Sequence, residues 1–413
     1  MRPSPLAFYG VLTALLEPLA PMLLRRRAAR GKEDAARLDE RLGRTTRPRP
    51  DGRLVWLHGV SVGEAMSLLP LVAALHAARP ELVLLVTSGT RTAAEMLARR
   101  LPDGVIHQYA PIDAPRTVKR FLDHWRPSLA IFVESELWPN LIQDAHARGV
   151  KLALVSARIT EGTARNWRRF PVAAHEIFSS FDLILPQDDA TAGRVRRLGG
   201  SPGAKLNLKL AGEPLPADEA ELARLREACA GRKVVLAAST HPGEDEIVVG
   251  AFRSVAEADT LLILAPRHPE RGLDLAARFA ATRRAAGEAP SGAIHVADTL
   301  GELGLFFRLA DVVVMGGGWA GVGGHNPLEP ARIGRPILTG PNVSNAAEPY
   351  ADLFAEAAAI AAADTEALAR HLRGLLGNPA IGRRMGEAAL SYASRQSAAL
   401  DDALARLEPL LAA

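Results

Sequence analysis

The chain has 413 residues, which is too long for one ordinary hydrophobic core, so two compact domains are expected. Apolar residues make up 48% of the sequence and charged residues 23%, a composition that excludes a largely disordered or fibrous chain. The formal charge of +4 favours an anionic ligand or a membrane face as a partner, and we expect no nucleic acid. Cys229 is the only cysteine, which excludes an intrachain disulfide and a cysteine-based metal cluster.

The N-terminal segment, residues 1–30, is predicted to associate with a membrane. Its stretch 6–24 is mostly apolar but is interrupted by Glu17 and two prolines, which weakens the case for a spanning helix. Three arginines follow at 25–27 and would keep the next part of the chain on the cytoplasmic side. The sequence leaves open whether the segment crosses the membrane or lies as an amphipathic helix on the membrane or on the protein.

Residues 31–205 are predicted to form the first domain. Short apolar runs of strand length alternate there with stretches whose apolar residues recur every three or four positions. The runs are Leu54 to Leu57, Leu82 to Thr87, Leu129 to Val133, Leu152 to Val155 and Leu183 to Leu185, and the helical stretches include Ala65 to Ala78 and Thr92 to Arg100. This alternation predicts an α/β, doubly wound, Rossmann-like domain with a parallel sheet covered on both faces.

The same pattern restarts after a glycine- and proline-rich linker, so residues 206–413 are predicted to form a second Rossmann-like domain. Its strand-like runs are Val234 to Ala238, Leu261 to Ala265, Ile294 to Val296, Val312 to Val314 and Pro336 to Leu338. Two such domains facing each other create a cleft at the carboxyl ends of both sheets. Candidate site residues should therefore follow strands.

Acidic residues follow two strands of the first domain. Glu64 can act as a general base, but Ser61 and Glu64 also have the S-x-x-E spacing of a helix capping box, which the spacing alone favours. Glu134 and Glu136 flank one serine after the strand that ends at Val133. The two carboxylates point the same way if the strand persists, or either one caps the helix that follows.

Polar loops follow two strands of the second domain. Arg267 can neutralise a nucleotide phosphate, whereas Ser239 and Thr240 either contact a ligand or cap a helix. His241 and His268 lie in the same loops, but the histidines have no persuasive metal-ligand spacing. No metal is therefore expected.

The most specific segment is glycine-rich, with G-G-G-W at 316–319 and G-G-H-N-P-L-E-P at 323–330. Glycines let the backbone approach a ligand, Asn326 can cap, and Pro327 can start a helix whose free N–H groups receive a phosphate. Glu329, one turn into that helix, can accept hydrogen bonds from both ribose hydroxyls. These features favour a nucleotide site over a simple turn, and the lack of a G-x-x-x-x-G-K-[ST] motif argues against a P-loop ATPase.

Five motifs together resemble the 3-deoxy-D-manno-oct-2-ulosonic acid (Kdo) transferase family. They are S-V-G-E at 61–64, V-E-S-E-L-W-P-N-L-I at 133–142, S-T-H-x-G-E at 239–244, A-P-R-H-P-E-R at 265–271 and G-G-H-N-P-L-E-P-A at 323–331. The resemblance covers nearly the whole chain. It implies a glycosyltransferase of GT-B architecture on the cytoplasmic side of the bacterial inner membrane. Such an enzyme moves Kdo from CMP-Kdo to a lipid A precursor, lipid IVA, in lipopolysaccharide biosynthesis, without a cofactor.

The resemblance also implies residue roles. Glu64 takes the position of the general base, which overrides the capping-box interpretation, and Glu134 and Lys209 take positions that stabilise the transition state. Around Lys209 this chain departs from the family's pattern, because the family's glycine and aspartate are replaced by Leu206 and Ala211. The residues implied to bind CMP are Pro266, Arg267, Leu300, Gly301, Glu302, Asn326, Pro327, Leu328 and Glu329.

The reaction expected from these roles is a direct displacement with inversion. An acceptor hydroxyl, deprotonated by Glu64, attacks the anomeric carbon of Kdo as CMP leaves, and Arg267 and Lys209 stabilise the leaving phosphate. Two alternatives are a two-Rossmann transferase that uses a UDP-sugar and a membrane-tethered module that binds a nucleotide without catalysis. Competition by CMP rather than UDP distinguishes a CMP-Kdo transferase from the first alternative. Release of CMP from CMP-Kdo in the presence of acceptor distinguishes it from the second. A nicotinamide oxidoreductase is disfavoured because no G-x-G-x-x-G follows the first strand of either half.

Overall fold

The structure is a computed structural model that describes residues 5–412. The chain divides into two compact units: the first runs up to Gly212 and also includes the chain from Ala398 onward, and the second is Glu213–Ser397. The segment boundaries that the sequence predicts at residues 30 and 205 stay predictions. Each unit is described separately below.

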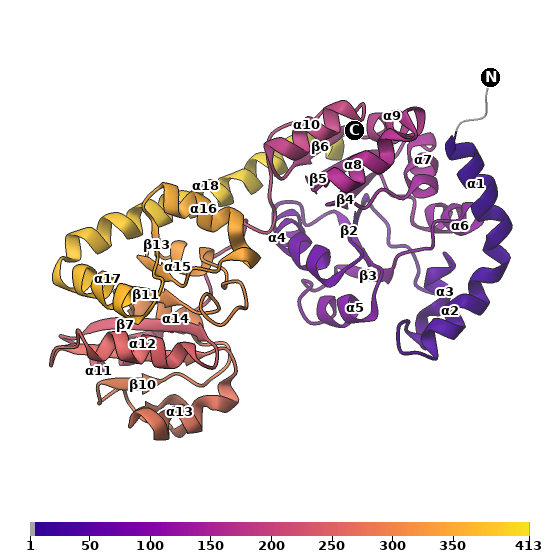
Figure 1. Cartoon of the computed structure of the whole chain (residues 1–413). Helices are drawn as coiled ribbons and strands as arrows, with labels where there is room; N and C mark the ends of the chain where they lie inside the picture. The colour runs from indigo at the N-terminus through magenta and orange to yellow at the C-terminus, as the bar shows by residue number, and fades with distance from the viewer. Residues whose placement is uncertain (1–4, 413) are drawn as a thin grey trace. The chain divides into compact units, whose positions relative to one another are not determined.

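A six-stranded parallel sheet forms the centre of the first unit, with strand order β3-β2-β1-β4-β5-β6 (Figure 1). Its strands are β1 (Leu54–His58), β2 (Val83–Ser88), β3 (Ile106–Tyr109), β4 (Leu129–Val133), β5 (Lys151–Ala157) and β6 (Leu183–Pro186). This is the order of a doubly wound sheet, and the direction of winding reverses between β1 and β4. Ligands of such sheets bind beyond the carboxyl ends of the two strands at this switch point.

Helices cover both faces of this sheet, as the sequence predicts. Because strand residues alternate between faces, Trp56 packs into one hydrophobic core while Val55 and Leu57 pack into the other. The helices are α3 (Leu38–Arg41), α4 (Val62–Ala78), α5 (Arg91–Leu97), α6 (Pro115–Trp125), α7 (Pro139–Ala147), α8 (Glu161–Arg168), α9 (Pro171–Ser179) and α10 (Asp189–Arg197), with a 3-10 turn η2 (Ala35–Arg37).

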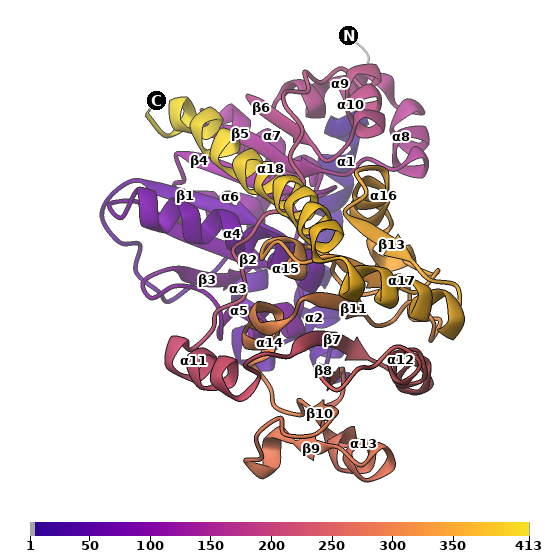
Figure 2. The same ribbon diagram turned by 90° about the vertical axis from the view of Figure 1, so that its left-hand side faces the viewer.

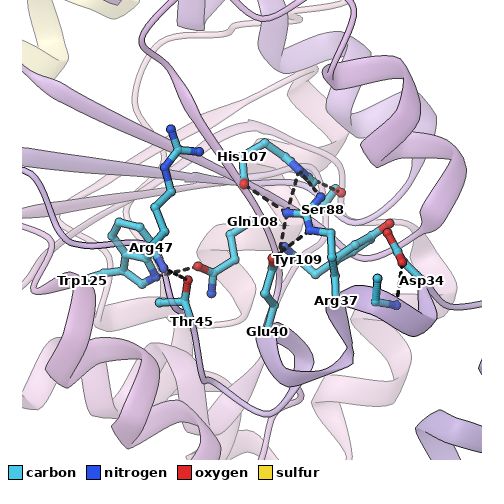
Figure 3. A network of polar contacts seen from close by, with 11 residues as sticks. Asp34, Arg37, Glu40, Thr45, Arg47, Ser88, His107, Gln108, Tyr109 and Trp125 are labelled. Carbon is cyan, nitrogen blue, oxygen red and sulfur yellow. Dashed lines mark hydrogen bonds and ion pairs between the residues drawn. The ribbon is translucent and has the colours of Figure 1, made fainter.

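The edge strand β3 was not predicted, because it reads I-H-Q-Y and contains no apolar run. Two of its residues, His107 and Tyr109, contact the short helical segment that precedes β1. The backbone N–H of Tyr109 donates to Glu40 at 2.7 Å, and Arg37 forms an ion pair with the same carboxylate at 2.7 Å. Figure 3 shows this network along the strand. Hydrogen bonds as well as packing therefore define this edge of the sheet.

The N-terminal segment forms α1 (Pro5–Leu16), the 3-10 turn η1 (Glu17–Leu19) and α2 (Ala20–Ala28). Over Pro5–Ala28 it is long and apolar enough to cross a membrane by length and composition. Figure 1 shows α1 beside α6 and α7, with which it makes contacts.

The second unit contains a seven-stranded parallel sheet of order β13-β12-β11-β7-β8-β10-β9. Its strands are β7 (Lys233–Thr240), β8 (Thr260–Pro266), β9 (Thr282–Arg283), β10 (Ile294–Val296), β11 (Val312–Met315), β12 (Ile337–Thr339) and β13 (Ala359–Ala361). The five predicted strands are present. Strands β9, of two residues, and β13, rich in alanine, lack the β-branched runs that reveal a strand in sequence. The switch point of this sheet lies between β7 and β11.

The helices of this unit are α11 (Glu219–Ala228), α12 (Glu244–Arg253), α13 (Gly272–Phe279), α14 (Leu303–Leu309), α15 (Leu328–Ala331), α16 (Ala347–Ala355) and α17 (Thr365–Gly377), with 3-10 turns η3 (Pro269–Arg271), η4 (Arg284–Ala286) and η5 (Ser344–Ala346). The long final helix, α18 (Pro379–Ala412), is continuous (Figure 2). Its last turns belong to the first unit, where Ala403, Leu407 and Leu411 are buried in the core.

Candidate active site

Glu64 lies at the start of α4, directly after β1, at the switch point of the first sheet. Ser61 caps this helix, because its hydroxyl accepts the backbone N–H of Glu64 at 3.3 Å. In return, Glu64 Oε2 accepts the backbone N–H groups of Val60 at 2.7 Å and Ser61 at 2.8 Å. The capping box that the spacing predicts is therefore present, and its two backbone donors fix the orientation of the carboxylate.

Glu134 lies on the neighbouring strand end. Strand β4 stops at Val133, and Glu134 has a left-handed backbone with φ of 57°, so the strand does not persist to Glu136. Helix α7 begins after Trp138 without a side-chain cap, so neither carboxylate caps it. Instead, Glu134 forms an ion pair of 2.6 Å with Lys209 Nζ. The structure thus brings two of the predicted catalytic residues together in the first unit.

Glu136 belongs to the same cluster, although the sequence assigned it no role. Its Oε2 accepts a hydrogen bond from Trp138 Nε1 at 2.6 Å. Burial, together with the negative charges of Glu64 and Glu134, raises the pKa of Glu136 to about 7. Glu136 is therefore protonated far more readily than an exposed glutamate.

His58, the last residue of β1, was not singled out from the sequence. It is almost fully buried, and its Nδ1 lies 2.9 Å from the hydroxyl of Thr87. Burial lowers the pKa of His58 to about 3, so the ring is neutral. Its Nε2 faces Glu136 Oε2 at 3.8 Å. A buried histidine at the end of a central strand has no distinctive sequence signal, because its partners come from other elements.

In the second unit, the predicted CMP-binding residues follow β8, β10 and β11. Pro266 ends β8, and the backbone N–H of Arg267 donates to Thr240 at 3.0 Å. Burial raises the pKa of Glu329, while the positive charges of Arg332 and Arg267 lower it.

The segment at Asn326 differs in part from its prediction. Asn326 Oδ1 accepts the backbone N–H of Leu328 at 3.1 Å, as a capping side chain does. However, Pro327 occupies the N-cap position and the helix that follows, α15, is only the four residues Leu328–Ala331. Because a macrodipole builds up over several turns, so short a helix has only a small dipole. A phosphate at the start of this helix would therefore be bound by a few backbone N–H groups.

Leu300, Gly301 and Glu302 lie in the loop after β10. Glu302 forms an ion pair with Arg284 Nη2 at 2.6 Å, and Leu300 is 85% exposed. This loop lines a groove of about 910 Å³ together with Arg284 and Glu221. The sequence did not single out Arg284, whose two carboxylate partners come from separate segments.

Glu244, the last residue of the S-T-H-x-G-E motif, organises the glycine-rich loop. It is fully buried and accepts four backbone N–H groups, those of Gly317 at 2.7 Å, Trp319 at 2.8 Å, His241 at 3.0 Å and Ala320 at 3.1 Å. Gly316 is required at this place, because a Cβ there would lie 2.4 Å from the carbonyl oxygen of Ser239. The loops after β7 and β11 are thus joined through one carboxylate.

For Ser239 and Thr240, in the loop after β7, the structure decides whether they cap the helix that follows. Gly243 is the N-cap residue of α12, so neither Ser239 nor Thr240 caps it, and Thr240 donates instead to Asp245 at 2.7 Å. His241 Nε2 lies 2.9 Å from His325 Nε2. Within residues 5–412, no three His, Cys, Asp or Glu side chains are arranged to hold a metal ion.

Comparison with known proteins identifies the family. Residues 36–211 match the family described as 3-Deoxy-D-manno-octulosonic-acid transferase (kdotransferase). The chain is 35% identical over 410 residues to the 3-deoxy-D-manno-octulosonic acid transferase of Rickettsia bellii, covering 96% of this chain and 97% of that protein. The chain belongs to the Kdo transferase family. It is also 31% identical to the Haemophilus influenzae transferase, over 98% of both chains.

Membership in the Kdo transferase family makes this chain a glycosyltransferase of lipopolysaccharide biosynthesis. Its architecture agrees with that activity. A solved glycosyltransferase from Rickettsia africae has a similar structure, with a TM-score of 0.56 over 88% of this chain and 99% of that one. At 10% identity this likeness concerns the fold alone. The predicted α/β fold class with two doubly wound, GT-B-type domains is confirmed.

Proposed function

We propose that this member of the family transfers Kdo from CMP-Kdo to the lipid A precursor lipid IVA with inversion of configuration, and that Glu64 is the general base. The observation that carries this proposal is the cluster of Glu64, Glu134 and Lys209 at the switch point of the first sheet. In doubly wound sheets this is the place where ligands bind.

Glu64 suits the role of base because its position is fixed. Two backbone N–H groups donate to Oε2 and hold the carboxylate in one orientation. A base must lie within hydrogen-bond reach of the hydroxyl that it deprotonates. In the proposed step, Glu64 takes the proton of the acceptor hydroxyl, the hydroxyl oxygen bonds to the anomeric carbon of Kdo, and the bond to the CMP phosphate breaks. A single displacement inverts the configuration.

Lys209 and Glu134 would stabilise the charges that develop in this step. Their ion pair of 2.6 Å holds the ammonium group in place before the reaction, so little reorganisation is needed. Arg267 would neutralise the CMP phosphate, with help from backbone N–H groups near Asn326. Glu329 would accept hydrogen bonds from the ribose. Leu300 and Gly301 would complete the nucleotide contacts.

The N-terminal helices would place the enzyme on the cytoplasmic face of the inner membrane. One side of the segment is bound to the first unit: Tyr9 donates to Asp113 at 3.0 Å, and Glu17 accepts the Thr117 hydroxyl at 2.8 Å. The other side is apolar and exposed, with Phe8, Val11, Leu12, Leu15, Leu16, Leu19, Met22 and Leu23. Because a spanning helix would have to leave its polar partners, we infer that the segment lies on the bilayer rather than crossing it.

The variant Glu64→Gln tests the base assignment. Glutamine keeps a side-chain oxygen for the capping box, so the fold should be retained, but it cannot accept the hydroxyl proton. Since general base catalysis contributes about 100-fold or more, kcat for Kdo transfer to lipid IVA should fall by at least about that factor. CMP release from CMP-Kdo and product formation measure the effect.

The matched control is Glu95→Gln, because Glu95 is an exposed glutamate on α5 that pairs with Arg91. It should transfer Kdo at the wild-type rate. If Glu64→Gln is folded and transfers Kdo at close to the wild-type rate, Glu64 is not the base.

A further inference from the structure

Ser156 lies near the end of β5 in the first unit, and the proposed reaction assigns it no part. Its side chain is fully buried. We propose that Ser156 is a positioning residue for the ion pair between Lys209 and Glu134: its hydroxyl fixes the backbone beside Lys209, so that the ammonium group meets the carboxylate. This inference rests on the proposed function, because it takes Lys209 as a group that stabilises the charges of the reaction.

A bulge in β5 determines the direction of the Ser156 side chain. Strand β5 pairs with β6 at Leu154 and again at Ala157, and the register shifts between these two residues. An extra residue of this kind forms a β-bulge, which can redirect a side chain. Ser156 has a φ of 51°, in the left-handed region that residues other than glycine seldom adopt. The bulge therefore directs its hydroxyl, and the regular alternation of the strand does not.

The Ser156 hydroxyl accepts two hydrogen bonds from outside β5. One comes from the backbone N–H of Leu208 at 3.2 Å, and the other comes from Gln187 Nε2 at 3.1 Å. A hydroxyl oxygen has two lone pairs, so these two donors use both of them. Because Leu208 immediately precedes Lys209, the first bond fixes the backbone next to the residue that carries the ammonium group.

The segment around Lys209 is buried on both sides of that residue. Leu208 and Leu210 are buried, whereas the Lys209 side chain is 44% exposed. Without the Ser156 hydroxyl, the buried N–H of Leu208 would lose this acceptor. A buried N–H without an acceptor is unfavourable, so the segment would shift toward another partner. Such a shift would move the ammonium group of Lys209.

The residues around Ser156 also hold the other partner of the ion pair. The backbone N–H of Glu134 donates to the carbonyl oxygen of Val155 at 3.3 Å, and the N–H of Arg158 donates to that of Glu134 at 3.1 Å. Glu134 is therefore fixed by residues on either side of Ser156 in the chain. Since one turn holds both partners, it sets the distance of 2.6 Å between Lys209 Nζ and Glu134 Oε1.

The first test is a double-mutant cycle on the full-length enzyme. Ser156→Gly removes the hydroxyl and introduces a residue that readily adopts a positive φ, so the fold should be retained. Because a small displacement of a reacting group is costly, kcat should fall by about 10- to 100-fold. In the Lys209→Ala background, the same substitution should change kcat by less than about twofold, because the group on which it acts is absent. Equal losses in both backgrounds would indicate a structural role alone and overturn the inference.

Two further variants show whether the hydroxyl itself is needed. Ser156→Ala keeps the Cβ and should reproduce both results, and transfer at the wild-type rate in this variant would contradict the inference. Ser180→Gly is the control, because Ser180 is another buried serine of the first unit. Its hydroxyl donates to the carbonyl oxygen of Glu176, four residues earlier, at 2.6 Å. This variant should transfer Kdo at the wild-type rate.

A second measurement does not depend on activity. The amine of Lys209 must leave its ion pair before it can react with acetic anhydride, so the rate of acetylation, followed by mass spectrometry, reports whether the pair is intact. The rate at Lys209 should rise several-fold in Ser156→Gly and also in Glu134→Gln, which lacks the carboxylate charge. The rate at Lys119, which pairs with Asp123 at 2.7 Å in the same unit, should stay constant in both variants.

Acetylation and transfer together separate this inference from the proposed function. If Lys209 is acetylated as slowly in Ser156→Gly as in the wild type, Ser156 does not position the lysine and the inference is overturned. If acetylation is faster in Ser156→Gly but Lys209→Ala transfers Kdo at the wild-type rate, Ser156 positions the ion pair, and only the role of Lys209 in the reaction fails.

Discussion

Carboxylates organise the strand ends of both units, but they do so with different partners. In the first unit, Glu64 accepts two backbone N–H groups, and in the second, the fully buried Glu244 accepts four backbone N–H groups. Burying a charge is unfavourable unless hydrogen bonds replace its hydration. The four donors replace that hydration at Glu244, so its task is structural: it fixes the glycine-rich loop.

The variant Glu244→Gln should release this loop. A glutamine has one acceptor oxygen and presents its own N–H₂ to backbone donors, so some buried N–H groups lose their acceptor. Each unsatisfied N–H costs about 1–3 kcal/mol. We expect the affinity for CMP, measured by calorimetry, to fall at least about tenfold, a loss of about 1.4 kcal/mol. Glu257→Gln, an exposed glutamate of the same unit, should bind CMP as the wild type does. Unchanged affinity in Glu244→Gln would show that the loop does not depend on this carboxylate.

For single residues, the sequence predicted which residue types lie at the site but not which side chains they contact. The S-x-x-E spacing of Ser61 and Glu64 predicted the capping box correctly, yet the same four letters suit a catalytic base, and spacing cannot separate the two. The proximity of Glu136 to His58, at 3.8 Å, requires β1 and the turn after β4 to meet, which no local pattern describes. Lys209 and Glu134 were linked only by the family resemblance, and the structure places them 2.6 Å apart.

Among the elements, the buried central strands were predictable and the edge strands were not. Apolar runs such as Leu129 to Val133 are covered by helices on both faces, and this burial is what a sequence pattern reports. Strand β3 lies at an edge and is stabilised by Glu40 and Arg37, so it has no such pattern. Helix α15 has one turn, because Gly334 ends the segment with a left-handed backbone soon after it starts.

The N-terminal helices give a prediction at the same scale. Replacing Phe8, Leu15 and Met22 together by serine removes three exposed apolar side chains while leaving the polar contacts of Tyr9 and Glu17 in place. Because each apolar side chain transferred to lipid contributes about 1.5–3 kcal/mol, binding to phospholipid vesicles should fall by well over about tenfold, as measured by sedimentation. CMP binding should not change.

The control for this experiment replaces three exposed apolar residues elsewhere, Leu273, Ile381 and Leu390, by serine. Its vesicle binding should equal that of the wild type. Equal losses in the two triple variants, or no loss in the first, would contradict a membrane contact made by α1 and α2.

At the scale of the whole molecule, the chain returns to its first unit at the end. The last turns of α18 place Ala403, Leu407 and Leu411 in the core that contains Leu206 and Leu208. The first unit is therefore completed only when the C-terminal segment has been synthesised. The alanine-rich sequence of 379–412 is helical by propensity, but it does not indicate which core its last turns join, so this feature could not be predicted.

The variant Leu407→Ala tests this closure of the first unit. Leu407 is fully buried, and truncating a buried leucine to alanine costs about 2–5 kcal/mol through lost burial and the cavity left behind. Because the cavity lies in the core of the first unit, amide hydrogen exchange should accelerate in β1 and β4 and stay unchanged in β7 and β8. Leu390→Ala, at a 42% exposed position of the same helix, should leave both sheets as protected as in the wild type. Faster exchange confined to the second sheet would show that the end of α18 stabilises the second unit, which would contradict its place in the core of the first.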